Sequence, residues 1–155
     1  NYNKKMQLEA GFTLQSSLYD DPVEYIEGEE PRSEFLRTPN QYGYFTYSLT
    51  PGDRFNASLS GVYTGPMELV HFAGAPEQTV DEYVTTPSFF EFGLKVGYTF
   101  KFEIVDSGLE IFAGVKNLSN AFQDDFDTLR DRDSGYVYGP GAPRTFYLGL
   151  RLHSF

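Results

Sequence analysis

The chain has 155 residues, no cysteine and two histidines, and its 22 acidic against 12 basic side chains give a formal net charge of −10. The lack of cysteine excludes disulfides, thiolate metal sites and cysteine nucleophiles, and the acidic balance argues against nucleic-acid binding, which needs a basic surface. Mean hydropathy is −0.40, and no segment is long and apolar enough for a transmembrane helix. The 12 tyrosines and 15 phenylalanines favour an aromatic-rich β protein, a class that includes membrane β-barrels.

Period-two alternation of apolar and polar residues runs through most of the chain and predicts strands with one apolar face. In the first segment the even positions from Met6 to Leu18 are nearly all apolar, whereas the odd positions are polar or glycine. Phe112 is an exception, because it falls among the polar positions of its strand. No segment of comparable length has helical periodicity, so we expect little helix. The predicted strands are 6–18, 41–49, 54–64, 89–102, 108–117 and 144–152.

Long and short connections alternate between these strands. Tight turns are indicated at 50–53, which contains Pro and Gly, and around 105–108. The long connections are 19–39, 69–87 and 118–141. In an up-and-down antiparallel sheet alternate connections leave at opposite ends, so all the long loops lie at one end, as in outer-membrane barrels. We therefore predict an all-β fold, an antiparallel up-and-down meander of about six long strands that is part of a large transmembrane β-barrel.

The acidity is concentrated in the three long loops. Residues 19–39 contain seven acidic residues against two arginines, 69–87 contain three against none, and 118–141 contain five against two. The strands and short turns together are nearly neutral. Solvation of the loops explains this pattern. The functional alternatives are binding of divalent cations at the outer surface and repulsion of anionic ligands from the rim.

Two motifs near the end of the chain resemble a known family. Residues 114–122, GVKNLSNAF, are similar to the G-x-x-N-L-F-(D/N) motif of TonB-dependent outer-membrane receptors, where it closes the penultimate strand. Residues 138–152, with PRTFYLGL at their centre, are similar to that family's final strand. The intervening 123–136 resemble Bacteroidetes-type receptors, and Phe155 matches the C-terminal aromatic residue that serves outer-membrane proteins as a barrel-assembly signal.

The phase of the last strand raises a separate expectation. Counting back from Phe155 in steps of two reaches Arg151 and Tyr147, whereas the apolar face of this strand has even numbers. We predict a one-residue bulge or a frayed end at 153–154. Without it Phe155 would face the lumen, which would weaken its interpretation as an assembly signal.

The resemblance implies that residues 1–155 are the C-terminal segment of such a receptor, with the plug domain and the earlier strands of a barrel of about 22 strands absent from this chain. It implies energised import of a large, scarce solute, such as a ferric siderophore, haem or cobalamin, with glycans or peptides as further classes. The implied partners are outer-membrane lipid and lipopolysaccharide, the receptor's own plug domain, the TonB complex through the missing N-terminal region, and the barrel-assembly machinery. The long loops would be extracellular and the short turns periplasmic.

The last long loop contains the candidates for ligand contact. Residues 131–135 form an Asp-x-Asp-x-Gly run, which can begin a calcium loop because hard cations take oxygen ligands. Its twelfth position is Ala142 rather than Glu, so it is no EF-hand. The alternative is a solvated loop with local Asp–Arg pairs. The calcium candidates are Asp127, Asp131 and Asp133.

Other aromatic and polar residues receive simpler interpretations. Tyr136 and Tyr138 are candidates for substrate contact, with packing inside the loop as the alternative. His71 is interpreted as an ordinary surface residue. The polar face of the strands would line a wet lumen around the plug. The strand aromatics expected to contact lipid and form interfacial girdles are Tyr42, Tyr44, Tyr47, Tyr63, Tyr98, Phe100, Phe102 and Tyr147.

No catalytic site and no cofactor is expected. Loop carboxylates without an accompanying nucleophile or base do not make a glycosidase, and nucleotide-binding and hydrolase motifs are missing. The alternative function is a soluble, acidic β-sandwich that binds carbohydrate, with or without calcium. The two interpretations differ over Phe12, Leu94 and Phe100, which face lipid in a barrel and are buried against a second sheet in a sandwich.

Overall fold

The computed structural model describes residues 5–102 and 107–154, and the elements in this part of the chain are strands. The strands are β1 (Met6–Leu14), β2 (Leu18–Val23), β3 (Arg32–Glu34), β4 (Gln41–Leu49), β5 (Phe55–Thr64), β6 (Glu68–His71), β7 (Glu82–Thr85), β8 (Phe89–Phe102), β9 (Ser107–Lys116) and β10 (Thr145–Ser154). The described residues contain no helix that is long and apolar enough to cross a membrane.

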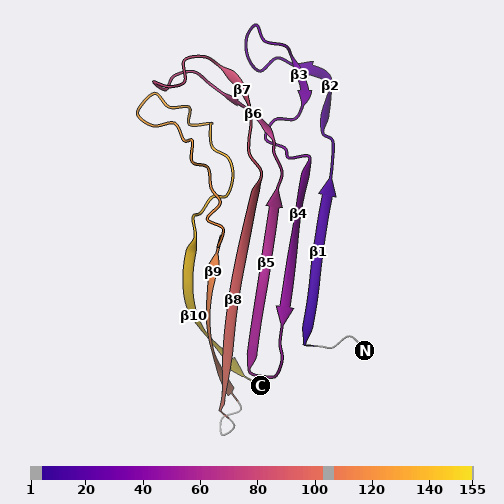
Figure 1. Ribbon diagram of the computed structural model, residues 1–155, viewed down its shortest axis with the longest axis vertical. Coiled ribbons are helices and arrows are strands. Elements are labelled where there is room, and N and C mark those ends of the chain that lie inside the picture. The colour runs from indigo at the N-terminus through magenta and orange to yellow at the C-terminus, as the bar shows by residue number, and fades with distance from the viewer. Residues whose placement is uncertain (1–4, 103–106, 155) are drawn as a thin grey trace.

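Six strands form one antiparallel sheet in the order β1-β4-β5-β8-β9-β10. Figure 1 shows these strands side by side, with the long connections at the upper end, where the short hairpins β2–β3 and β6–β7 also lie. This arrangement confirms the predicted up-and-down meander. The predicted turn at 50–53 joins β4 to β5 at the lower end, whereas the turn predicted around 105–108 lies partly outside the described residues. The sheet is not closed within the described chain, because β1 and β10 are its edges.

The pairing register gathers the apolar residues of all six strands on one face. A row across four strands shows this: Phe12 pairs with Gly43, Gly43 with Tyr63, and Tyr63 with Phe90. Because successive side chains of a strand point to opposite faces, every second residue from these positions points the same way. The register of β9 and β10 continues the pattern. The apolar sets read from the sequence therefore form one surface, with the polar sets opposite.

The apolar face is exposed along its whole width. Phe12, Leu94 and Phe100 are 62%, 39% and 46% exposed, and Leu152 in the edge strand β10 reaches 82%. The other sheets in the described chain are two-stranded hairpins at the loop end, so no second sheet covers this face there. The sandwich alternative required these side chains to be buried, and that prediction is wrong.

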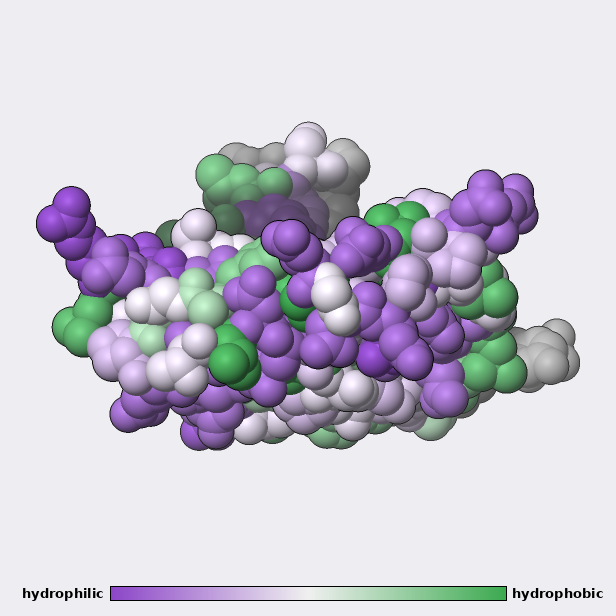
Figure 2. All heavy atoms as spheres, turned by 90° about the horizontal axis from the view of Figure 1, so that it is seen from above, coloured by the Kyte–Doolittle hydropathy of each residue, from purple (hydrophilic) through white to green (hydrophobic). Residues whose placement is uncertain are grey.

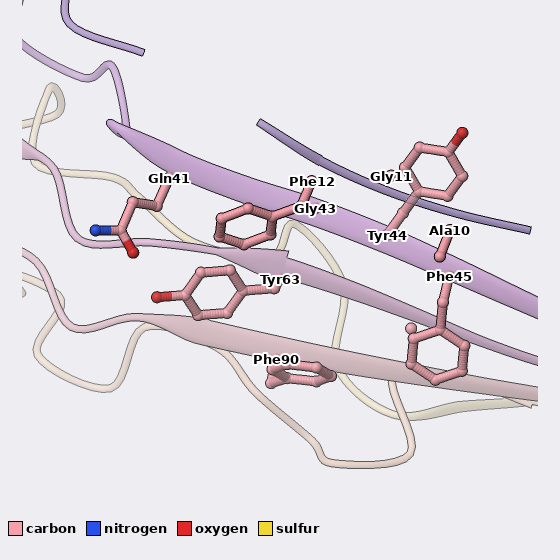
Figure 3. A pocket seen from close by; sticks show the side chains of 10 residues that line it. Ala10, Gly11, Phe12, Gln41, Gly43, Tyr44, Phe45, Tyr63 and Phe90 are labelled. Atoms are coloured by element: carbon pink, nitrogen blue, oxygen red, sulfur yellow. The ribbon is translucent and has the colours of Figure 1, made fainter. Parts of the chain in front are cut away.

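Near the loop end the apolar face carries a shallow aromatic hollow of about 700 Å³ (Figure 3). The rings of Phe12, Tyr63 and Phe90 form a row along it, with successive centroids 6.2 and 5.8 Å apart. Gly43 and Gly61 line the hollow, and a β-carbon there would overlap the rings of Phe12 and Phe45, so these glycines let the rings lie close to the sheet. A group of aromatic rings thus lies at the level where the strands meet the long loops.

Aromatic rings on the polar face lie over glycines of the neighbouring strand. Tyr147 pairs with Gly114, where a β-carbon would overlap the tyrosine ring and come within 2.6 Å of the Leu94 carbonyl oxygen. Phe112 pairs with Gly149, where a β-carbon would overlap the phenylalanine ring. Phe112 departs from the alternation because the glycines beside it leave room for an aromatic ring on the polar face.

The first strand is shorter than predicted, because it ends at Leu14 rather than Leu18. The Gln15 amide still donates to the Asn40 carbonyl at 3.0 Å, but Leu18 already begins β2, which pairs with β3 instead of β4. The long connections therefore contain hairpins. Their strands have three to six residues, too few for alternation to reveal them in the sequence.

The last strand has no bulge. β10 pairs with β9 without a register shift from Thr145 to Ser154, so the predicted bulge or frayed end at 153–154 is wrong. The ladder continues because Gly108 and Ser107 remain available as partners at this end. Phe155 and its predicted role as an assembly signal lie outside the described residues.

Three aromatic residues that were expected to contact lipid lie on the polar face. Tyr42, Tyr44 and Tyr147 occupy the positions that alternate with the apolar set of their strands. The Tyr44 hydroxyl donates to the Glu9 carboxylate at 3.1 Å, which gives it a polar partner on that face. The lipid-contact prediction is wrong for these three residues because aromatic character does not identify the face, whereas the strand register does.

The buried core lies at the loop end of the sheet. Leu69, Phe89, Tyr136 and Tyr138 form a cluster of buried side chains, and Leu69 is fully buried. These residues come from β6, from the start of β8 and from the last long connection. The core therefore fixes two of the long connections relative to the sheet.

Candidate functional site

The three long connections, 15–40, 65–88 and 117–144, are called here the first, second and third loops. Seen from above, the loop end of the molecule has a predominantly hydrophilic surface (Figure 2). This agrees with the concentration of acidic residues in these segments. Because the strands hold all three loops at one end, any ligand site that they build together lies here.

Asn117 ties together the two ends of the third loop. Its backbone is left-handed, with a φ of 49°, which asparagine tolerates better than most residues. Its Nδ2 donates to the carbonyl oxygens of Ala121 at 2.7 Å and Ala142 at 2.9 Å, and its Oδ1 accepts from the Ala121 amide at 2.9 Å. Asn120 adds a second link, because its Oδ1 accepts from the Arg144 amide at 3.0 Å. The N-L-S-N residues of the family-like motif thus close this loop.

Tyr136 and Tyr138 are buried, at 4% and 7% exposure. Their hydroxyls donate to the two oxygens of the Asp125 carboxylate, each at 2.7 Å. Gln123 completes the cluster, since its Nε2 donates to the Tyr136 carbonyl at 3.2 Å and its Oε1 accepts from the Tyr138 amide at 2.9 Å. The sequence left two interpretations open for these rings, substrate contact and packing inside the loop. The rings lie as packing inside the loop requires.

These contacts shift the ionisation of the cluster. Burial alone would raise the pKa of Asp125, but hydrogen bonds from Tyr138, Tyr136 and Gln123 outweigh burial and hold that pKa below its usual range. Burial and the neighbouring Asp125 carboxylate raise the pKa of Tyr138 to about 12, and they raise the pKa of Tyr136 as well. The cluster therefore keeps one charged carboxylate and two neutral hydroxyls at neutral pH.

His71 joins the second loop to the third, which corrects its interpretation as a surface residue. It is only 7% exposed, and its ring stacks on Tyr136. Its Nε2 lies 3.0 Å from Asp127 Oδ1, and this hydrogen bond lowers the pKa of Asp127. No sequence pattern indicates this role, because the carboxylate partner is 56 residues away along the chain.

The carboxylates predicted to bind calcium accept hydrogen bonds from the backbone. Asp127 Oδ2 accepts from the Asp133 amide at 2.9 Å, and Asp133 accepts from the amides of Gly135 at 2.7 Å and Phe72 at 3.1 Å. Asp127 thus has the Asp133 amide and His71 as partners, and Asp133 has two backbone amides. Within 5–102 and 107–154 no three His, Cys, Asp or Glu side chains gather as a metal site requires. Calcium binding stays a prediction.

Further contacts join the loops to each other. A β-carbon at Gly74 in the second loop would come within 2.6 Å of the Asp131 carbonyl oxygen in the third. Arg37 in the first loop donates from Nη1 to the Val137 carbonyl at 2.9 Å, and its amide donates to the Glu68 carbonyl at 2.7 Å. The three loops therefore form one hydrogen-bonded unit.

A polar hollow of about 520 Å³ opens between the second and third loops. Two exposed apolar side chains stand beside it, Phe126 at 50% and Leu129 at 71% exposure. Two of the carboxylates that line it, Asp125 and Asp127, are already engaged by hydrogen bonds within the loops. Its ionisable lining residues are His71, Glu77, Asp124, Asp125, Asp127 and Tyr136.

The polar face of the sheet holds a second charged cluster, centred on Glu110 of β9. This side chain is only 4% exposed. Its carboxylate accepts from Asn56 Nδ2 at 2.9 Å and pairs with Arg151 at 3.1 Å and His153 at 3.4 Å. Gly97 gives it room, because a β-carbon there would lie 2.6 Å from the Glu110 oxygen. A buried carboxylate is tolerated when partners of this kind compensate for lost solvation.

An antiparallel meander of long strands, with an exposed apolar face, a polar face and hydrogen-bonded loops at one end, has the features of part of a β-barrel wall. The sequence matches no family model and no curated protein. In structure the chain is similar to the ferric-catecholate import receptor Fiu from E. coli K12 in its closed form, with a TM-score of 0.66 and 23% identity. The similarity covers 97% of this chain and 19% of the receptor chain, so this chain spans about a fifth of that receptor's length.

Proposed function

We propose that this chain is the C-terminal segment of a TonB-dependent transport receptor in a Gram-negative outer membrane. The observation that carries the proposal is the unbroken apolar face across six paired strands, with a polar face opposite. In hydrocarbon every backbone polar group needs a partner, which limits spanning structures to helices and closed barrels. A sheet with an apolar outer face and a polar inner face fits the wall of such a barrel. The structural similarity to an import receptor supports the same proposal.

The two faces and the two ends then have separate partners. The apolar face contacts membrane lipid and lipopolysaccharide, and the polar face lines the lumen around the receptor's plug domain. The three loops are extracellular and the turn at 50–53 is periplasmic. The upstream region of the receptor engages the TonB complex, and the barrel-assembly machinery inserts the protein.

The transported solute is proposed to be large and scarce, with metal chelates such as ferric siderophores, haem or cobalamin as the leading class. The motifs at 114–122 and 138–152 support this class through the family that they resemble, and the neighbouring solved structure is an import receptor for ferric catecholates. This segment contributes wall, lumen surface and loops. Ligand capture would use the extracellular loops, followed by rearrangement of the plug domain.

Single-cysteine labelling tests the proposed orientation in the full-length protein. This segment has no native cysteine, so Ser134→Cys in the third loop and Gly52→Cys in the turn provide two unique exposed sites, provided that the remainder of the receptor lacks reactive cysteine. A membrane-impermeant maleimide is applied to intact cells. We expect Ser134→Cys to react at once and Gly52→Cys to react only after the outer membrane is permeabilised.

Two results would argue against the proposal. Recovery of the full-length protein in the soluble fraction, with both positions equally reactive, would contradict a membrane location. Reaction of Gly52→Cys but not Ser134→Cys in intact cells would contradict the proposed orientation. Uptake of labelled ferric chelates by cells with and without the receptor then tests the substrate class separately.

A further inference from the structure

The polar hollow between the second and third loops has most of its side-chain hydrogen-bond donors already in use. The His71 ring donates from Nε2 to a third-loop carboxylate at 3.0 Å, since an ionised carboxylate can only accept. The Tyr136 hydroxyl donates to another carboxylate of that loop at 2.7 Å. Gln78 Nε2 donates to the Val80 carbonyl at 2.6 Å. In the described lining, the hydroxyl of the exposed Thr128 is the remaining side-chain donor.

The hydrogen-bond acceptors of the same lining remain open. Because Nε2 donates, Nδ1 of the neutral His71 imidazole is an acceptor. It has no partner among the described residues, although the side chain is only 9% exposed. In the same part of the chain the carboxylates of Glu77 and Asp124 have neither a hydrogen bond nor an ion pair. No lysine or arginine within 5–102 and 107–154 lines the hollow. Open acceptors without a nearby cation are complementary to a positively charged donor.

The size and the apolar wall of the hollow favour an organic cation over a metal ion. Its volume of about 520 Å³ is in the range of small-molecule sites, about 300–1,000 Å³. The exposed side chains of Phe126 and Leu129 line one part of it. They offer apolar surface and an aromatic ring, which attracts an organic cation over its face. A metal site would need a group of three ligating side chains, and the described residues contain none.

We propose that this hollow binds an organic cation, a solute with a primary ammonium group next to an apolar part. The three N–H donors of an ammonium ion match in kind the acceptors of His71, Glu77 and Asp124. The apolar part would pack on Phe126 and Leu129. Resting on the proposed function, this inference narrows the imported solute to a chelate with a protonated amine side arm. An anionic chelate would meet open carboxylates and no compensating cation in this hollow.

Saturation-transfer NMR on the purified full-length receptor tests the site with two probes of the same shape. Phenylethylamine is cationic at neutral pH, and phenylethanol is its neutral counterpart. We expect roughly millimolar binding of the amine, about 3- to 10-fold tighter than binding of the alcohol, as for one or two exposed charge pairs. The variant Glu77→Gln with Asp124→Asn should weaken the amine to the level of the alcohol. The control Glu29→Gln with Glu30→Gln removes the same charge from exposed positions of the first loop and should change either affinity by less than about twofold.

The outcomes separate the site from the transport function. Equal binding of the amine and the alcohol to the wild type would overturn the proposal, and so would unchanged amine binding in Glu77→Gln with Asp124→Asn. Leu129→Ser should weaken both probes by a similar factor, and unchanged binding of both would contradict the apolar wall. Selective amine binding in a receptor that imports no chelate would support the site and contradict the proposed function alone. Import of an anionic chelate without any amine binding would overturn the ligand class and leave the proposed function intact.

Discussion

The imidazole of His71 lies flat against the ring of Tyr136, with 3.5 Å between ring centroids and 5° between planes. Nε2 of the same imidazole contacts Asp127, and the Tyr136 hydroxyl donates to Asp125. The stack therefore connects the second loop to two carboxylates of the third. Long charged loops that lack such contacts open easily. Because these contacts join the second loop to the third, we expect the two loops to open together as one unit.

Replacement of His71 by alanine should loosen the third loop while leaving the sheet intact. The variant loses a ring stack and a hydrogen bond, which together stabilise the loop by about 1–3 kcal/mol. Hydrogen exchange of residues 127–138 should accelerate roughly 5- to 150-fold, whereas β5 and β8 should exchange at the wild-type rate. His71→Phe keeps the stack and should give a smaller effect. Equal acceleration in the sheet would contradict the loop as a separate unit.

The pH range of loop stability follows from the shifted pKa values. The pKa values of Asp125 and Asp127 are lowered, so their contribution is complete above about pH 4 and is lost as the pH falls through the lowered values. The pKa of Tyr138 is raised from 10.0 to about 12, so its contribution is complete below pH 10 and is lost as the pH rises towards 12. Hydrogen exchange of the third loop, corrected for intrinsic rates, should show protection that is lost as the pH falls below about 4 and again as it rises towards 12. Protection that stays unchanged at both extremes would contradict this assignment.

Asn117 should be the most sensitive single position of the third loop. Asn117→Ala removes the side-chain hydrogen bonds to Ala121, Ala142 and Ser119 and puts alanine into a left-handed backbone that asparagine tolerates better, which together costs about 2–4 kcal/mol. Asn117→Gly removes the same hydrogen bonds without the backbone strain, so it should cost less. Protease cleavage within 118–144 measures the difference. Equal cleavage of the wild type and both variants would show that the asparagine does not close this loop.

The strands could be predicted from the sequence because alternation is a local property. The alternate apolar residues from Phe90 to Phe102 can be assigned to one face of the strand without any knowledge of the neighbouring strands. How side chains of neighbouring strands fit together depends on the register, and it could not be predicted in this way. Tyr147 follows the polar positions of β10, and only its pairing with Gly114 explains how the ring fits there.

The candidate site could be predicted only in part, because its contacts join distant segments. The third loop was identified from its motif and charge, and Tyr136 and Tyr138 were identified as notable residues. Their shared partner Asp125 and the His71 stack depend on the fold of the second and third loops. No local pattern marks a histidine that will be buried by a loop elsewhere in the chain.

Gly114 should not tolerate a larger residue, because Tyr147 and the Leu94 carbonyl occupy the space where a β-carbon would lie. We expect Gly114→Ala to destabilise the receptor by about 1–3 kcal/mol. The measurement is the temperature at which the folded barrel loses its altered mobility in gel electrophoresis. Gly141→Ala is the matched control, since nothing lies within 4 Å of a β-carbon there. Equal melting of the two variants would show that the close packing is unimportant.

In the proposed barrel one face of this sheet meets lipid and the other meets water. Nitroxide labels on single cysteines along β8 test it in the membrane-embedded, full-length receptor. Labels at Leu94, Val96 and Phe100 should collide with dissolved oxygen, because these positions lie on the apolar face. Labels at Lys95 and Thr99 should instead show low oxygen accessibility, because they face the lumen. High accessibility to a water-soluble nickel complex at the even positions, or no alternation at all, would contradict the account.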